Sequence, residues 1–216
     1  MKLLLRLVGL ALVALLAYSG YVIVDAISRT GPVVDSLMSP GCLPTPLDEF
    51  PEQWLDALVE IEDPAFLTHH GVDLRTPGAG ERTITQYLAG QLYPSDFLPF
   101  MEELRVSLIA FFVLDPKVAK DVQLLIYVNC VELGEVSGAQ VRGFAQAAEA
   151  YFEKQLPDLE DDEFLSLVAM LLDPSRYDPV DHPMENAVRV ERIRSVLDGS
   201  YARTGRMDVR YYGEDE

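Results

Sequence analysis

The sequence predicts an all-α domain that follows one N-terminal transmembrane helix. The first observation is an uncharged, apolar run from Leu7 to Val24, preceded by Lys2 and Arg6. The second is a series of segments over residues 52–199 in which apolar residues recur at the three- and four-residue spacing of an amphipathic helix. The third is that no segment alternates apolar and polar residues convincingly enough to predict a half-buried strand.

The N-terminal run is just long enough to cross a bilayer, because a spanning helix needs about 20 predominantly apolar residues. Its positive flank favours a cytoplasmic N-terminus and an exported remainder. A cleaved signal peptide is the alternative, since Ala17-Tyr18-Ser19 resembles a small-residue cleavage site. The apolar run continues past this site to Val24, which favours an uncleaved anchor over residues 1–27. We therefore expect a single-pass protein of the cytoplasmic membrane with an extracytoplasmic (periplasmic) C-terminal domain.

The composition excludes one large class of partner. The chain of 216 residues has 35 acidic and 17 basic side chains and a formal net charge of -18. Nucleic-acid binding requires clustered Lys and Arg for the phosphates, so we expect no nucleic-acid partner. The two cysteines, Cys42 and Cys130, have no CxxC or Cys/His spacing typical of zinc sites. A disulfide between them and two unpaired thiols are both compatible with the sequence. No cofactor is expected, and the use of a divalent metal stays open.

Helix signals divide the exported part into a linker, a domain and a tail. Residues 28–51 are rich in proline and lack periodicity, which predicts a linker. We expect a helical domain over residues 52–199 and an acidic tail over residues 200–216. About seven helices are predicted in the domain, over 52–62, 83–93, 98–114, 117–131, 138–154, 161–173 and 186–197.

Glu62 and Asp63 close the first of these helices, which Pro64 ends. Phe66 follows as an expected core residue. A carboxyl group at a helix end beside an aromatic ring can be shielded from water, which raises its pKa toward the range useful for proton transfer. A solvated Glu at a helix end is the commoner alternative, because most Glu side chains are exposed. The pattern alone therefore makes Glu62 one candidate for acid–base chemistry.

Several short motifs follow one another along the chain. The pair "ED" at 62–63 is followed by Phe66, His69, Gly71 and Asp73, and then come "TITQYLAGQLY", "LIYVN" and "GFAQAAEAYFEK". The last are "LVAMLLDPSRYDP" and "AVRVERIRSVL". In this order they resemble the first four signatures and the C-terminal pattern of the peptidoglycan glycosyltransferases, glycosyltransferase family 51. The resemblance runs from Trp54 to Leu197, and several ordered matches are more specific than any one of them.

The resemblance implies a lysozyme-like, largely helical fold and an enzyme that polymerises lipid II in cell-wall synthesis. It implies that Glu62 is the general base and that Asp63 helps to orient the site. By the same resemblance, the expected substrate-binding residues are Asp63, His69, Arg82, Thr83, Thr85 and Gln86. We expect Glu62 to face a groove, with Phe66 buried beneath it and Thr85 or Gln86 across from it.

The chain departs from the family pattern at charged positions. The family's second Glu, four positions before the Asn of "YLN", is Leu125 here, and the lysine of the second signature is Gly90. The basic pair that opens the third signature falls near Met101 and Glu102. The segment between the first two signatures is short, only Leu74 to Ala79. Such losses are serious, because one preorganised donor in an active site is worth about 10²–10³ in rate.

Other charges in the chain are candidates to replace the missing ones. Arg82 lies eight positions before Gly90, near the same helical face, and stands in the place of a serine in the family pattern. Further candidates are the cations Arg105 and Arg142 and the carboxylates Glu102, Glu103, Asp121 and Glu132.

Three functions remain open. The first is an active glycosyltransferase. The second is a catalytically impaired relative that binds lipid II or glycan strands, or that scaffolds a complex of cell-wall synthesis proteins. The third, a lytic transglycosylase, fits least well, because the signatures match the polymerising family.

Overall fold

The computed structural model describes residues 1–39, 43–94 and 101–211, and within these ranges the protein is mostly helical. The predicted fold class, a lysozyme-like helical domain after one long apolar helix, is confirmed. The α-helices are α1 (Lys2–Leu37), α2 (Glu52–Glu62), α3 (Ile84–Leu92), α4 (Glu102–Ile109), α5 (Asp115–Lys117), α6 (Lys120–Cys130), α7 (Phe144–Phe152), α8 (Asp161–Met170) and α9 (Pro183–Leu197). Shorter elements are the 3₁₀-helices η1 (Leu47–Glu49) and η4 (Leu156–Asp158), the π-helix η3 (Ala110–Leu114) and the strands β1 (Glu132–Val136) and β2 (Ala139–Arg142).

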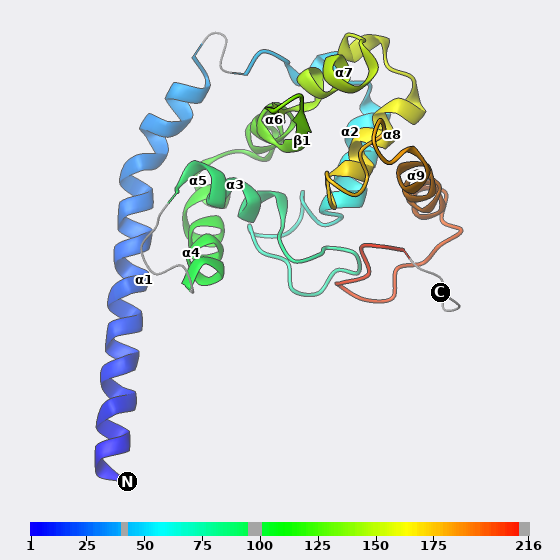
Figure 1. The fold of residues 1–216 in the computed structure, drawn as a ribbon. Coiled ribbons are helices and arrows are strands. Elements are labelled where there is room, and N and C mark those ends of the chain that lie inside the picture. Colours follow the sequence, from blue (N-terminus) through cyan, green and yellow to red (C-terminus); the bar gives the residue numbers. More distant parts are fainter. Residues whose placement is uncertain (40–42, 95–100, 212–216) are drawn as a thin grey trace.

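Helix α1 stands beside the domain, and its N-terminal half extends away from it (Figure 1). In the described part of the chain, α1 is the one helix long and apolar enough to cross a membrane. Residues 28–37, predicted as linker, continue this helix despite Pro32. The reason is packing, because Ala26 is buried and Thr30 shares a hydrogen bond with the hydroxyl of Tyr93 at 2.8 Å. Tertiary contacts thus outweigh the proline and glycine signals.

Two groups of helices enclose the core (Figure 1). Helices α3 to α6 lie next to α1, whereas α2, α7, α8 and α9 lie on the far side. Between α2 and α8, the Trp54 and Phe164 rings stack at 4.6 Å, and Phe144 packs on Phe164 at 5.2 Å. Phe66, predicted as a core residue, is fully buried. Burial of large aromatic side chains dominates the hydrophobic stabilisation of such cores.

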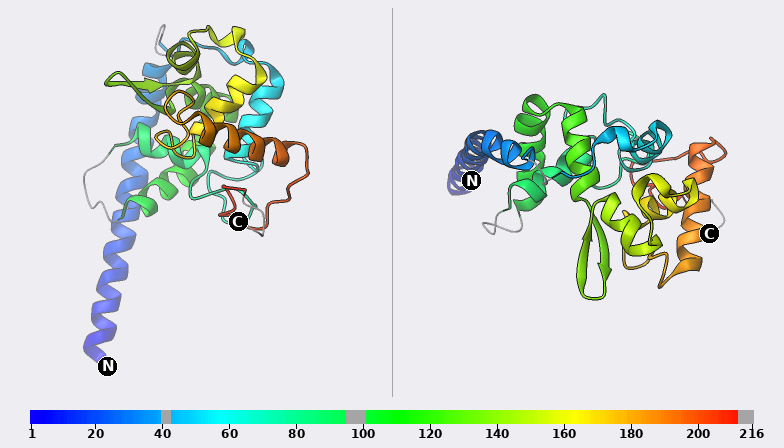
Figure 2. Two further views of the ribbon diagram at one scale, coloured as in Figure 1. Left: turned by 45° about the vertical axis from the view of Figure 1, so that its right-hand side comes forward. Right: turned by 90° about the horizontal axis from the view of Figure 1, so that it is seen from above.

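A β-hairpin replaces the start of the helix predicted over 138–154. Strands β1 and β2 pair antiparallel, with Val136 opposite Ala139, and the hairpin projects from the domain (Figure 2). Ser137 and Gly138 both have positive φ, 54° and 81°, as a two-residue type I′ turn requires. The helix prediction is wrong over 138–143, because the chain turns at Ser137 and Gly138 and continues as a strand, so that α7 begins only at Phe144.

The helix predicted over 98–114 is two elements, α4 and η3, and residues 98–100 lie outside the described ranges. The backbone of η3 passes close to Gly71, where an added β-carbon would lie 2.4 Å from the Ala110 oxygen. Gly71 also has φ 79°, a conformation that favours glycine. This close approach holds the loop after α2 against η3.

The described part of the predicted tail, residues 200–211, folds back onto the domain, and we call it the C-terminal strap. The Gly78 amide donates to the Gly205 oxygen at 2.9 Å, and the Gly80 amide donates to the Arg206 oxygen at 2.8 Å. The strap therefore lies against the loop that precedes α3, below α9 in Figure 1. Cys42 lies outside the described ranges, and the choice between a Cys42–Cys130 disulfide and two thiols therefore stays open.

Candidate active site

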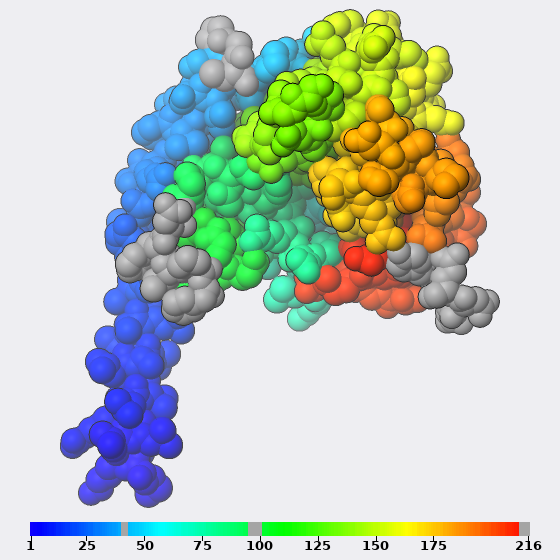
Figure 3. Space-filling model, in the orientation of Figure 1, coloured from blue at the N-terminus to red at the C-terminus, as the bar shows by residue number. Residues whose placement is uncertain are grey.

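A cavity of about 720 Å³ opens between the two groups of helices. In the space-filling view its mouth lies between the teal and green surface of α3 to α6 and the yellow and orange surface of α8 and α9, with the red strap below (Figure 3). Its wall is formed by the end of α2, the loop before α3, parts of α3, α4, α6 and α9, the start of β1, the turn after α8, and the strap. The lining residues with polar or charged side chains are Glu62, Glu81, Arg82, Thr83, Tyr87, Glu103, Tyr127, Glu132, Arg189, Asp208 and Arg210.

Glu62, the last residue of α2, lies in this wall, as predicted. Its carboxyl group is ringed by protein atoms, and this burial raises its pKa from 4.5 to about 7. The neighbouring charge of Asp63 also raises the pKa, whereas the positive charge of Arg189 and a hydrogen bond from Tyr127 lower it. The Tyr127 hydroxyl donates to Glu62 Oε2 at 3.3 Å. A carboxyl group that titrates near neutral pH can both accept and return a proton.

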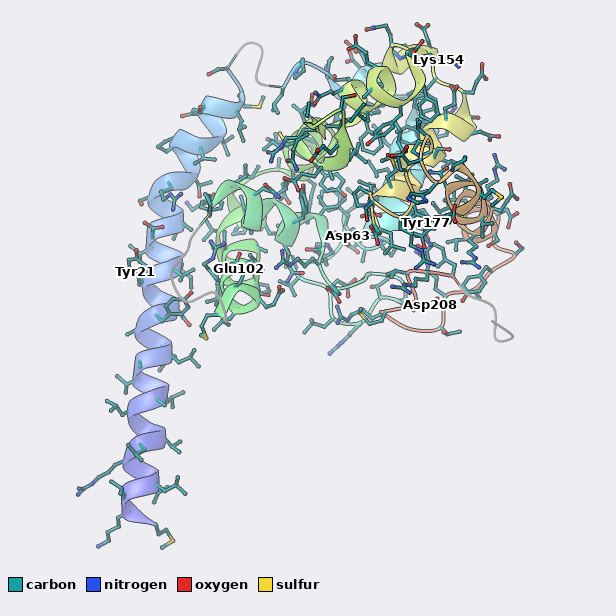
Figure 4. The ribbon with its side chains drawn as sticks, viewed as in Figure 1. Tyr21, Asp63, Glu102, Lys154, Tyr177 and Asp208 are labelled. Atoms are coloured by element: carbon teal, nitrogen blue, oxygen red, sulfur yellow. The ribbon has the colours of Figure 1, made fainter. Side chains whose placement is uncertain are left out.

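Asp63 and His69 form a buried pair directly behind Glu62. His69 Nε2 lies 2.9 Å from Asp63 Oδ2, and the same carboxylate accepts a hydrogen bond from the Ile84 amide at 3.0 Å. Ile84 is the first residue of α3, so Asp63 joins the end of α2 to the start of α3 (Figure 4). Neither Asp63 nor His69 lines the cavity. Their arrangement supports the predicted role of Asp63 in orienting the site. Neither side chain is placed to contact a substrate in the cavity.

Arg82 and Thr83 lie where the loop enters α3, and both line the cavity. The Arg82 guanidinium pairs with Glu103 of α4. A β-carbon placed on Gly90 would lie 3.7 Å from Arg82 Nη1, so the arginine occupies space next to the position where the family pattern has a lysine. Thr83 caps α3, because its hydroxyl accepts from the Gln86 amide, and it donates to the Gly71 oxygen at 2.7 Å.

Thr85 and Gln86 do not lie across the cavity from Glu62, contrary to our expectation. Thr85 is fully buried and donates to Gln123 of α6 at 2.7 Å. The Gln86 side chain accepts from the Thr83 amide and donates to Ser107. The α3 period turns both side chains into the core, where they join α3 to α6 and α4. They are structural residues of the site's frame.

Leu125 is also absent from the cavity wall. It is half-buried on α6, and its backbone oxygen accepts from the Asn129 side chain at 2.9 Å. Tyr127, two residues later, is the α6 side chain that reaches Glu62. A carboxylate at position 125 would therefore not face the cavity. Of the carboxylates named as substitutes, Glu103 and Glu132 line it.

Sequence reasoning missed two residues beside Glu62. Arg189 of α9 lines the cavity at 2% exposure, and Tyr211 of the strap packs its ring 4.5 Å from the Arg189 guanidinium. Arg189 lies within the stretch "AVRVERIRSVL", which has three arginines, and the sequence does not distinguish among them. Tyr211 lies in the segment treated as a tail.

The cavity is acidic overall. Five carboxylates line it against three arginines. Glu103 already pairs with Arg82, and Glu132 pairs with Arg142 at 2.7 Å. Over the described ranges, no group of three or more His, Cys, Asp and Glu side chains is arranged to hold a metal ion.

Comparison with known proteins identifies the family to which the chain belongs. The family model described as Transglycosylase matches residues 39–199. Penicillin-binding protein 1F of Bacillus subtilis (strain 168) is 28% identical over 228 aligned residues, covering 91% of this chain and 31% of that protein. Penicillin-binding protein 1B of Vibrio cholerae is 33% identical over 69% of this chain and 20% of that protein, and penicillin-binding protein 1A of Neisseria flavescens is 31% identical over 67% and 19%. The chain thus spans about a third or less of the length of these relatives. Because the family model covers most of the chain and includes Glu62, the chain belongs to the peptidoglycan transglycosylase family.

Proposed function

We propose that this protein is a peptidoglycan glycosyltransferase that acts on lipid II at the outer face of the cytoplasmic membrane, with Glu62 as its general base. The observation that carries the proposal is the Glu62 carboxyl group, which lines a cavity of about 720 Å³ and has a pKa of about 7. A general base works best when its pKa lies near the working pH. It is then deprotonated in a large share of the molecules and is still basic enough to take the proton.

In the proposed reaction, the Glu62 carboxylate takes the proton of the acceptor sugar's 4-hydroxyl group. The hydroxyl oxygen then forms a bond to the anomeric carbon of the donor sugar, and the bond from that carbon to the lipid pyrophosphate breaks. The pyrophosphate leaves with the bonding electrons. Arg82 is the cavity residue best placed to attract its charge, since it lies beside position 90.

Helix α1 supports the proposed location. Its N-terminal half is exposed and apolar, with Lys2 and Arg6 at its start, which favours a cytoplasmic N-terminus and an extracytoplasmic domain. Lipid-linked sugars could then reach the cavity from the membrane that holds α1. Fusion of a reporter that is active only in the cytoplasm to the C-terminus should give no signal.

A catalytically impaired relative that binds lipid II or glycan strands is the second candidate, and the charge of the cavity favours it. Five carboxylates surround the space, and Glu103 already pairs with Arg82. A leaving pyrophosphate would therefore meet less net positive charge than transition-state stabilisation requires.

One experiment separates the two candidates. The full chain, purified in detergent, is incubated with labelled lipid II, and both polymer formation and binding are measured beside a Glu62→Gln variant. Polymer from the unmodified chain but not from the variant supports the enzyme. Binding without polymer, unchanged in the variant, supports the impaired relative. Polymerisation that Glu62→Gln leaves intact would remove Glu62 from the chemistry.

A further inference from the structure

The C-terminal strap forms part of the cavity wall although it lies outside the matched family region, residues 39–199. Its main chain pairs with the loop at Gly78 and Gly80. Arg203 Nη1 donates to the Glu60 oxygen in α2 at 2.7 Å, two residues before Glu62. In Figure 4, Asp208 marks the strap on the side of the site away from α7. The strap is therefore bonded to the loop before α3 and to α2, and both of these segments contribute residues to the cavity wall.

Tyr211 anchors the far end of the described strap. It is 2% exposed, and its hydroxyl donates to the Ile61 oxygen at 3.3 Å, directly before Glu62. Its φ is 56°, a left-handed conformation that is rare for a bulky side chain. Such a conformation persists only where the surrounding contacts hold it, and it is often found at functional sites.

Tyr211 packs against the side chain of Arg189. The guanidinium lies 4.5 Å from the centre of the Tyr211 ring. Its Nε and Nη1 are buried and have no hydrogen-bond partner among the described residues. Burying a cation with incompletely satisfied donors is costly, so its side-chain hydrogen bond with Tyr211 and the attraction of nearby negative charge matter. Glu62 is the carboxylate whose charge acts on Arg189.

The groups that face Glu62 come from four elements. Asp63 follows it in the chain, Tyr127 reaches it from α6, Arg189 faces it from α9, and Tyr211 packs behind Arg189. Farther along the cavity wall lie Glu81, Arg82, Glu103, Glu132, Asp208 and Arg210. Arg189 is the cation among these groups that acts on the Glu62 carboxyl group.

We propose that Tyr211 is a positioning residue for Glu62: its ring holds the Arg189 guanidinium in the cavity wall, where the cation acts on the carboxylate. This inference rests on the proposed function only in giving Glu62 the role of base. The strap is then a required part of the site, supplied from outside the region that the family model matches.

The test measures the titration of Glu62 directly. The full chain in detergent is labelled with ¹³C at the Glu side-chain carboxyl carbons, and the Glu62 resonance is assigned by its loss in Glu62→Gln. The variants are Tyr211→Leu, Tyr211→Phe and Arg189→Met, with Ala202→Ser on the exposed face of the strap as control. Because Arg189 lowers the pKa of Glu62, we expect the midpoint to rise by about one unit in Arg189→Met and in Tyr211→Leu. Tyr211→Phe keeps the ring and should move the midpoint little, and Ala202→Ser should leave it unchanged.

Each result decides the proposal. An upward shift in both Arg189→Met and Tyr211→Leu supports it. An unchanged midpoint in Tyr211→Leu overturns it, and a downward shift also overturns it, because the ring would then serve only to exclude water. If Tyr211→Leu does not fold, Arg189→Lys replaces it. Lysine keeps the charge but loses the flat guanidinium that stacks on the ring, so an unshifted midpoint there would overturn the role of the stack.

The same variants separate this inference from the proposed function. If the unmodified chain makes no polymer from lipid II but the midpoint shifts as expected, the positioning role stands and the function fails. If polymer forms and depends on Glu62, while Tyr211→Leu changes neither the midpoint nor the acid limb of the pH–rate profile, the function stands and the positioning role fails.

Discussion

Replacing Glu62 by Gln should stabilise the folded protein at alkaline pH while removing the proposed general base. In the native state the Glu62 carboxyl group has a pKa of about 7, compared with 4.5 for the solvated group. Between these values the folded chain binds more protons than the unfolded chain, so stability falls as pH rises through that window. The difference of about 2.5 units corresponds to up to about 3 kcal/mol at pH 8, at 1.36 kcal/mol per unit. Solvent screening at the open cavity reduces this figure.

Glutamine has nearly the same shape and stays neutral at every pH. Glu62→Gln should therefore nearly match the unmodified protein at pH 4, where Glu62 is mostly protonated in both states, and exceed it by up to about 3 kcal/mol at pH 8. Trp54 is the single tryptophan of the chain and stacks on Phe164 in the core. Its fluorescence during denaturant unfolding of the full chain in detergent, at a series of pH values, reports the free energy of unfolding.

The matched control is Asp56→Asn, an exposed carboxylate on the same helix. It should not change the pH dependence of stability beyond a few tenths of a kcal/mol, as is usual for surface substitutions. If Glu62→Gln and the unmodified protein keep the same difference in stability from pH 4 to pH 8, burial does not perturb Glu62. The assignment of the base would then lose its main support.

Three further substitutions test the frame of the site. Gly90→Ala should raise the free energy of unfolding by about 0.5–1 kcal/mol, because alanine favours the helix and its β-carbon meets nothing closer than 3.7 Å; a fall measured by the same fluorescence assay would show that this space is not open. Leu125→Glu should not increase polymer formation from lipid II, because position 125 does not face the cavity; a gain in the polymer assay would contradict the cavity wall described here. Gly71→Ala should destabilise by more than 1 kcal/mol, since it combines a positive φ with a clash against Ala110, and an unchanged denaturation midpoint would show that the loop is free to move.

The sequence predicted the elements whose signals are local. The end of α2 two residues before Pro64 and the helical class follow from periodicity and from the helix-breaking effect of proline. It did not predict the continuation of α1 to Leu37, because that depends on contacts with Tyr93, far along the chain. The hairpin was missed although its Ser-Gly turn was readable, since the following Ala- and Gly-rich stretch favoured a helix.

The residues of the candidate site likewise fall into those with a local sequence signal and those without one. The position of Glu62 in the cavity wall could be predicted from the residues around it together with the ordered signatures. Thr85 and Gln86 belong to the second signature, yet which face of α3 they occupy depends on where α4 and α6 pack. Arg189 and Tyr211 reach Glu62 only because α9 and the strap fold back over more than a hundred residues. Pairings of this kind have no local signal.

The first signature acts mainly as a frame for one reactive group. Phe66 fills the core, Asp63 holds the first amide of α3, and His69 holds Asp63. Gly71 accepts the Thr83 hydroxyl with its carbonyl oxygen. Of these residues, only Glu62 presents its functional group to the cavity. A chain can therefore keep the whole signature because the shape of the site requires it, whatever its rate of turnover. The signature is thus strong support for the geometry around Glu62 and weak support for activity. In the proposed reaction, the charges that act on the substrate lie outside the signature: those of Arg82 and Glu103 on one wall of the cavity and that of Arg189 on the other.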